Sequence, residues 1–281
     1  MADLSPAQRQ LAAALRASRR RSGMTIAVLA QALGWTTKQV SRTELAQRQV
    51  SAAEVASWAE ATGASQDARA ELEQLLSDAD HELRTWWDIR ARGGGVPGRQ
   101  EDVAVYEAQS ERISNFQLIV PGLLQTADYA RRVFMLGHSA DDEEIEASLA
   151  VRLRRQDILY DATRQFDYVL SEAALHLDLG SGGAVLRAQA DRLISLDTLP
   201  NVSLAVLPFT ATPPILPTSG FSIYERPGQP LVLLETLVSD VMWRGDHEVE
   251  AYRTAFAGLR AASVTGEEAH ALIREVMTTG R

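Results

Sequence analysis

Four side chains within one short segment could contact the edges of DNA bases. Thr37, Lys38, Ser41 and Arg42 all carry hydrogen-bond donors, and among their neighbours in Thr37–Leu45 only Val40 is strongly apolar at the centre. Arg and Lys are the residues that most often contact guanine, and a helix can present such residues to the major groove. The segment is therefore predicted to be a recognition helix. A plain four-helix bundle with a polar third helix is the alternative.

The flanking residues predict the helices that would position these donors. A capping box that begins at Ser5 predicts a first helix, which ends near Gly23. Thr25 begins a second helix that Gly34 closes, and a second capping box at Ser51 begins a fourth. Two short helices joined by a tight turn that contains glycine form a helix-turn-helix. Residues 1–65 are therefore predicted to be an all-α DNA-binding domain.

The charge of the chain is unevenly distributed, which favours the same interpretation. Eight basic and three acidic side chains give residues 1–58 a formal charge of +5. Because the whole chain has a net charge of −9, the other residues carry −14. Such asymmetry is typical of a small nucleic-acid-binding module attached to an acidic body. The alternative is a solvated basic face with no function.

The larger C-terminal part offers candidates for a ligand pocket. Glu235 lies in the apolar segment Pro230–Leu237, where an unpaired carboxylate is costly, so it should meet either an arginine or a cationic ligand. The other candidates are polar side chains or aromatic rings that could line a pocket, although each ring is more often a core residue: Tyr106, Glu107, Gln125, Tyr129, Arg131 and Trp243.

Residues that would point to catalysis or to a metal are missing or scattered. The chain has no cysteine, which excludes disulfides, thiolate zinc sites and cysteine nucleophiles. It contains no phosphate-binding loop, nucleophile elbow or zinc-protease motif, and its five histidines are dispersed. The sequence therefore predicts neither an enzyme nor a cofactor nor a metal site. With no membrane-length apolar run and no export signal, a cytoplasmic location is expected.

The remaining segments predict a mixed α/β domain behind the helical one. A helical pattern over residues 67–90 and the glycine-rich run Gly93–Gly98 predict a connector over residues 66–98, and an α/β domain is expected over 99–281. Helices are predicted at 102–116, 126–136, 141–160, 184–196, 247–259 and 265–277. Strands are predicted at 166–171, 202–207, 220–224 and 230–237.

The N-terminal motifs resemble a known family of DNA-binding domains. Gly23-Met24-Thr25, Leu29-Ala30, Leu33-Gly34, Val40-Ser41-Arg42 and Glu44 are similar to the XRE-type (Cro/phage-repressor-like) helix-turn-helix. The resemblance implies that Thr36 caps the recognition helix, that Thr37, Lys38 and Arg42 read bases, and that Arg48 contacts phosphate. It also implies a buried ion pair between Arg19 and Glu44. The chain departs from the family at Ile26, Val28, Thr43, Ala46 and Val50.

The C-terminal motifs resemble one family of actinomycete regulators. Val120–Thr126 with Tyr129-Ala130-Arg131, Pro200–Val202, Val206–Phe209, Gly220–Ser222 and Leu234-Glu235 are similar to the sensor or interaction domain of WhiJ-like regulators.

The resemblance implies a homodimer on a double-stranded DNA operator that controls development or secondary metabolism. Its C-terminal domain would receive a small-molecule effector or a small acidic partner protein. The alternative is a protein-interaction hub that works with such a partner and has little DNA specificity of its own. The operator, the effector and the direction of regulation do not follow from the sequence.

Overall fold

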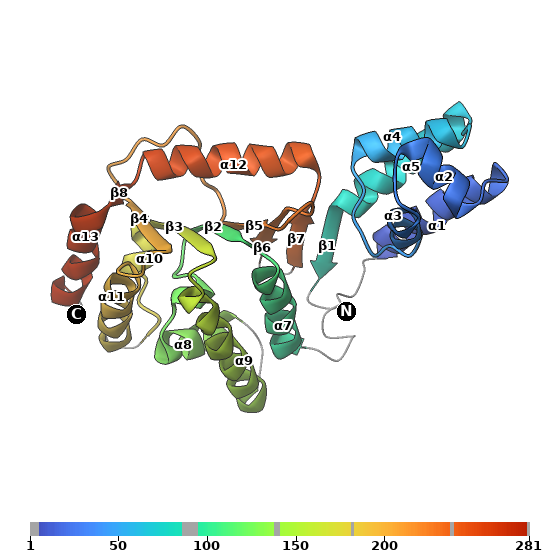
Figure 1. Ribbon diagram of the computed structural model, residues 1–281. Coiled ribbons are helices and arrows are strands. Elements are labelled where there is room, and N and C mark those ends of the chain that lie inside the picture. The colour runs from blue at the N-terminus through green and yellow to red at the C-terminus, as the bar shows by residue number, and fades with distance from the viewer. Residues whose placement is uncertain (1–5, 86–94, 138–140, 181–182, 237–238, 280–281) are drawn as a thin grey trace. The chain divides into compact units, whose positions relative to one another are not determined.

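The computed structural model describes residues 6–85, 95–137, 141–180, 183–236 and 239–279 (Figure 1). The chain divides into two compact units. The first comprises residues 1–83 with 242–248, and the second comprises residues 84–241 with 249–281. An all-α N-terminal region is therefore followed by a mixed α/β region, as the sequence predicted.

The first unit is a bundle of five helices around one apolar core. Its elements are α1 Pro6–Arg21, α2 Ile26–Leu33, α3 Thr37–Glu44, α4 Ala52–Ala61 and α5 Gln66–Asp80, and β1 His81–Thr85 follows them. Leu15, Leu29, Val40 and Trp58 are almost completely buried in the core. The Trp58 indole donates a hydrogen bond to the carbonyl of Leu15 at 3.1 Å, so its one polar atom is satisfied.

Local capping interactions fix the turn between α2 and α3. Gly34 ends α2 with φ of 68°, a left-handed conformation that glycine adopts without steric cost. Thr36 then caps α3, and its side chain accepts a hydrogen bond from the Gln39 amide at 3.2 Å while Gln39 reaches back to the Thr36 amide at 2.8 Å. A second capping box joins Ser51 to Glu54 at the start of α4. The predicted cap residue Ser5 lies outside the described residues.

A buried ion pair connects α1 to the end of α3. Arg19 Nε and Nη2 both donate to the Glu44 carboxylate, the latter at 2.9 Å, and the side chains are 10% and 5% exposed. Arg19 Nη1 also donates to the carbonyl of Met24 at 2.7 Å. Because both groups are withdrawn from water, each depends on the other for its electrostatic stabilisation. The pair therefore fixes the position of α3 relative to α1.

The chain reverses direction directly after α3 at Ala46, which has φ of 54°. Glycine adopts this left-handed conformation more readily than alanine does, because alanine carries a Cβ. Ala46 is only 7% exposed, so burial of its methyl group offsets part of the conformational cost.

The second unit is built on a mixed sheet. Its strands are β2 Arg112–Gln117, β3 Gln165–Ser171, β4 Val202–Leu207, β5 Phe221–Glu225, β6 Leu231–Glu235, β7 Ser239–Trp243 and β8 Val264–Thr265. They are ordered β7-β6-β5-β2-β3-β4-β8. Strands β2, β3 and β4 run parallel, whereas β5 is antiparallel to both β2 and β6. Ile113 pairs with Phe166 on one side and with Tyr224 on the other.

Helices cover both faces of this sheet (Figure 1). One face carries α12 Asp246–Ala261, and the other carries α7 Gly95–Ala108, α8 Ala127–Gly137, α9 Asp142–Arg155 and α11 Ala184–Leu196. The remaining elements are α10 Glu172–His176, α13 Gly266–Thr279 and the short 3-10 helices η1 Gly122–Leu124 and η2 Gln156–Tyr160. Asp141 caps α9 by accepting from the Glu144 amide at 2.9 Å, as expected for an acidic helix start.

Three predicted helices were wrong in extent, and one of them, predicted at 141–160, ends at Arg155, where the 3-10 helix η2 follows. The helix predicted at 102–116 begins at Gly95 and ends at Ala108, and β2 occupies Arg112–Gln117 instead. This strand contains Ser114 and Asn115 in buried positions, so it lacks the apolar run expected of a central strand. The Asn115 amide instead donates to Ser222 Oγ at 2.6 Å across the sheet.

The predicted connector also differs from the structure. The helix predicted at 67–90 ends at Asp80, where β1 begins. Trp86, Trp87, Gly93 and Gly94 lie outside the described residues. Residues 95–98, predicted as a loop, form the first turn of α7. The sequence also missed β7 and the short helix α10, because neither segment has a clear apolar period.

We expect the Arg19–Glu44 pair to dominate the stability of the first unit. Replacement of Glu44 by Gln leaves a buried guanidinium without its countercharge and should lower the free energy of unfolding by about 3 kcal/mol. Urea denaturation followed by tryptophan fluorescence measures this change, because Trp58 lies in the core. Arg20→Ala removes an exposed arginine from the same helix and should change stability by less than about 0.5 kcal/mol. Equal midpoints for the two variants would contradict this prediction.

Candidate functional site

Helix α3 presents a continuous polar face to solvent. Thr37, Lys38 and Arg42 are exposed and Ser41 is half-buried, whereas Val40, Thr43 and Glu44 are buried. The buried side chains fix the helix in the bundle and leave the donors free to face another molecule. In the structure, Arg42 Nη2 donates to the carbonyl of Gln47 at 3.0 Å, an exposed hydrogen bond that can be exchanged for a bond to a base.

Arg48 lies in the segment after α3 and is engaged within the unit. Its guanidinium pairs with Glu54, donates to Thr43 Oγ1 at 3.2 Å, and lies 4.8 Å from the ring centre of Trp35. These contacts hold the guanidinium in place, so any phosphate contact would compete with Glu54. The role of Arg48 in contacting phosphate stays a prediction.

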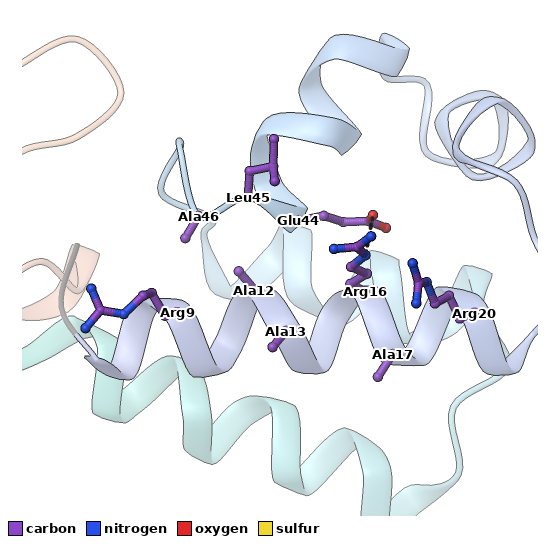
Figure 2. A pocket seen from close by; sticks show the side chains of 9 residues that line it. All are labelled: Arg9, Ala12, Ala13, Arg16, Ala17, Arg20, Glu44, Leu45 and Ala46. Carbon is purple, nitrogen blue, oxygen red and sulfur yellow. Dashed lines mark ion pairs between the residues drawn. The ribbon is translucent and has the colours of Figure 1, made fainter. Parts of the chain in front are cut away.

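The basic character of the first unit extends from α3 to α1. Figure 2 shows a groove of about 350 Å³ with Arg9, Arg16 and Arg20 on α1 along one side and Glu44–Ala46 on the other. Arg16 is 46% exposed and lies 3.9 Å from the Glu44 carboxylate. Small alanine side chains between the arginines leave the groove open. The sequence did not single out this surface.

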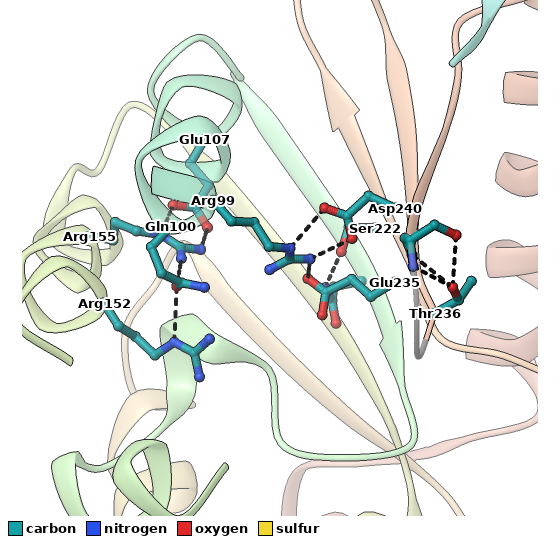
Figure 3. Close-up of polar contacts among 11 residues, drawn as sticks. Arg99, Gln100, Glu107, Arg152, Arg155, Ser222, Glu235, Thr236 and Asp240 are labelled. Carbon is teal, nitrogen blue, oxygen red and sulfur yellow. Dashed lines mark hydrogen bonds and ion pairs between the residues drawn. The ribbon is translucent and has the colours of Figure 1, made fainter. Parts of the chain in front are cut away.

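A second candidate site is a cavity inside the α/β unit. The cavity measures about 100 Å³ and lies between α7, α9, η1 and the central strands. Its lining is rich in charged and amide side chains, not apolar as a typical small-molecule pocket would be. The charged and amide groups that matter most are shown in Figure 3: Arg99, Gln100, Glu107, Arg152, Arg155 and Glu235.

Of the three arginines that line the cavity, Arg99 and Arg155 are paired with carboxylates. Arg99 donates to Asp240 at 2.8 and 3.0 Å and also pairs with Glu235. Arg155 donates from Nε to Glu107 at 2.8 Å, and both side chains are less than 8% exposed. Glu235 therefore has the arginine partner that its position predicted. The Glu235 side chain is 54% exposed, but partial desolvation of its carboxylate still favours a higher pKa; the Arg99 guanidinium outweighs this and holds the pKa of Glu235 below its ordinary value.

Arg152 differs because the described residues place no carboxylate within ion-pair distance of it. Its Nη1 donates to Gln125 Oε1 at 2.6 Å and its Nε donates to Gln100 Oε1 at 3.2 Å. The guanidinium also lies 4.1 Å from the ring centre of Phe134. Burial, reinforced by the positive charge of Arg155, lowers the pKa of Arg152 to about 9. It is still a cation at neutral pH, but one held at a cost in free energy.

The segment Val120–Thr126, which carries the C-terminal resemblance, forms one wall of this cavity. A side chain at Gly122 would place its Cβ 3.3 Å from Arg152 Nε, so glycine leaves room for the guanidinium. Gln125 Nε2 donates to the carbonyl of Val120 at 2.7 Å, which fixes the amide so that Oε1 faces Arg152. Gln156 Nε2 donates to the Gln125 carbonyl at 2.7 Å. The segment therefore positions the unmatched arginine.

Three of the seven predicted ligand-binding residues line the cavity and four do not. Glu107, Gln125 and Glu235 belong to its lining, whereas Tyr106, Tyr129, Arg131 and Trp243 are not part of it.

Each of these four side chains makes its contacts elsewhere in the fold. Tyr106 packs against Tyr224 with ring centres 6.0 Å apart, and Tyr129 is fully buried with its hydroxyl 3.4 Å from the Val120 amide. Arg131 is on the exposed side of α8, where it pairs with Glu146. Trp243 is half-buried at the end of β7.

Sequence reasoning missed Arg99, Gln100, Arg152 and Arg155. Arg152 and Arg155 stand in the last turn of α9, where basic residues normally complement the helix dipole in solvent. Nothing in the local pattern shows that two of them turn inward. The three-residue spacing places both on one face of a helix, which is the only signal that could have linked them.

Comparison with known families agrees with this division of the chain. A family model of a helix-turn-helix domain matches residues 10–72, and a family model described as a domain of unknown function (DUF5753) matches residues 100–275. The chain belongs to the DUF5753 family. No curated protein and no solved structure matches the chain.

The N-terminal match supports a DNA-binding regulator of XRE-like type, and the DUF5753 domain is consistent with the WhiJ-like resemblance. In the described ranges, no group of three or more His, Asp or Glu side chains could hold a metal ion. None of the described helices is long and apolar enough to span a bilayer.

Two matched substitutions should have opposite effects on the stability of the DUF5753 domain. Arg152→Met removes an unmatched buried charge and keeps the packing on Phe134, so it should raise the free energy of unfolding by about 1 kcal/mol. Arg155→Met, three residues later, leaves Glu107 buried without its partner and should lower it by about 3–5 kcal/mol. Urea denaturation followed by circular dichroism distinguishes them. Destabilisation of similar size in both variants would show that Arg152 is an ordinary structural residue.

Proposed function

We propose that this chain is a transcriptional regulator that reads a double-stranded DNA operator through α3 and receives a small-molecule effector in its DUF5753 domain. The observation that carries this proposal is the exposed polar face of α3, with Thr37, Lys38 and Arg42, in a unit that matches a helix-turn-helix domain. The resemblance to WhiJ-like regulators suggests that the regulated process is development or secondary metabolism.

We further propose that the regulator acts as a homodimer. Helix-turn-helix dimers bind two half-sites about 34 Å apart, so operator affinity depends on how the two recognition helices are spaced. An effector can bind one arrangement of the two helix-turn-helix units better than another. Such an effector shifts the population between the DNA-bound and free states. To move occupancy from mostly bound to mostly free, the effector must discriminate between the two arrangements by about 5 kcal/mol.

The groove on α1 favours a second candidate function. Arg9, Arg16 and Arg20 lie along one helix face beside the exposed side chain of Leu45. An acidic partner protein could place carboxylates against these arginines and an apolar side chain on Leu45. In that case the chain would be an interaction hub, and α3 would contribute little sequence specificity.

Salt-dependent DNA binding distinguishes the two functions. Fluorescence anisotropy with DNA from upstream of the chain's own gene should show a preference over scrambled DNA of about 10³ or more. Because each phosphate contact releases counterions, log affinity should fall against log salt with a slope of about −0.9 per contact. Weak binding with no preference for either DNA would instead favour the interaction hub.

Arg42 should be the most sensitive position on α3. Arg42→Ala should weaken operator binding about 5- to 150-fold and relax the base preference at one position, because an arginine contact to guanine is lost. The same anisotropy assay on a set of single-base operator variants measures both effects. Arg69→Ala on α5 removes another exposed arginine of the same unit and serves as the control. If Arg42→Ala behaves like this control, α3 is not the recognition helix.

A further inference from the structure

The Arg152 guanidinium retains unused hydrogen-bonding capacity inside the cavity. Arg152 Nη1 donates to Gln125 and Arg152 Nε donates to Gln100, while Arg152 Nη2 has no hydrogen-bond partner among the described residues. The residue is 8% exposed, so water from bulk solvent can satisfy this group only in part. A buried cation with free donors is costly unless an anion joins it.

Two further buried polar groups that line the same cavity have no hydrogen-bond partner within the ranges that the structure describes. Gln100 is fully buried, and its Oε1 accepts from both Arg152 and Arg155, which fixes the amide so that Nε2 is left unpaired. The Tyr168 hydroxyl is also unpaired, and Tyr168 is 1% exposed. Burial raises the pKa of Tyr168 well above its ordinary value, so the hydroxyl keeps its proton and can donate. Together with Arg152, these groups give the lining of the cavity three kinds of hydrogen-bond donor.

The charges around the cavity indicate what charge a ligand bound to these donors would carry. Arg155 is matched by Glu107, and Arg99 is matched by Asp240 and Glu235, whereas Arg152 has no carboxylate within ion-pair distance in the described part of the chain. The three arginines and three carboxylates already sum to zero, which favours a single added negative charge over a dianion. A cavity of about 100 Å³ admits a group of only a few heavy atoms.

We propose that this cavity binds a small carboxylate monoanion, whose oxygens accept hydrogen bonds from Arg152, the Gln100 amide and the Tyr168 hydroxyl. Arginine and carboxylate form strong charge-assisted hydrogen bonds, and the paired oxygens suit donors that converge from different elements. The three donors come from α9, α7 and β3, so the anion would bridge the helical layer and the sheet. The proposal rests on the proposed function only for the ligand's role as effector. Binding itself is independent of DNA.

Thermal denaturation of the full-length chain tests the binding. Acetate, propionate and butyrate are each titrated against chloride at equal ionic strength, with inorganic phosphate as a further arm. At least one carboxylate should raise Tm in a saturable manner, by about 3–6 °C at ten times its Kd. No saturable shift with any carboxylate, or a shift with phosphate alone, would overturn the proposal.

Variants locate the binding at Arg152. Arg152→Met should weaken carboxylate binding at least about tenfold, because a charge-assisted hydrogen bond is lost. Arg154→Met is the matched control: its side chain is 62% exposed and pairs with Glu101, so carboxylate binding should be unchanged. If Arg152→Met does not fold, Tyr168→Phe removes one donor and should weaken binding about threefold or more. Equal affinity in the wild type and in the variants tested would overturn the proposal.

A separate measurement keeps this inference distinct from the proposed function. Operator binding by the wild type is measured by anisotropy with and without the carboxylate that gives the largest Tm shift. Carboxylate binding that leaves operator affinity unchanged would support the site and contradict its role as the effector site. Failure of DNA binding with an intact, Arg152-dependent Tm shift would contradict the proposed function alone.

Discussion

The cost of taking a guanidinium out of water constrains both units of this protein. In the first unit, Arg19 reaches Glu44 with two donors and thereby ties α1 to the end of α3. In the second, Arg99 joins α7 to strand β7 through Asp240, and Arg155 joins α9 to α7 through Glu107. Each pair links elements that are distant in sequence, because a buried charge must find its partner wherever the fold provides one.

Arg152 is the exception, and the proposed anion site depends on it. Its guanidinium is also held in place inside the protein, because Gln100 and Gln125 accept hydrogen bonds from it and Phe134 packs against it. Neutral amides and an aromatic ring stabilise a cation less than a carboxylate does, so free energy is left for a ligand to recover. Proteins commonly retain such locally unfavourable groups at functional positions. The glycine at position 122 and the fixed amide of Gln125 show that the surrounding chain is shaped to accommodate this arginine.

Much of the fold was predictable wherever the signal is local. The caps at Thr25, Thr36 and Ser51 and the left-handed Gly34 set the helix ends of the first unit, and both α11 and β4 lie where periodicity placed them. Strand β2 was mistaken for helix because buried polar residues interrupt its apolar pattern. The candidate site was predicted less well: Glu107, Gln125 and Glu235 were found, but the arginines that hold them together were not.

The helix-turn-helix, its exposed donors and the alternation of helices and strands behind it could all be inferred from the order of the amino acids. These depend on capping, turns and periodicity, which act over a few residues. Which arginines are buried, and which carboxylates they meet, follows from the folded chain alone. That outcome depends on contacts such as Arg99 with Asp240, where the chain separates the partners by 141 positions. Burial of charge is a property of the assembled layers, so no local pattern of residues could reveal that Arg152 has no carboxylate partner among the described residues.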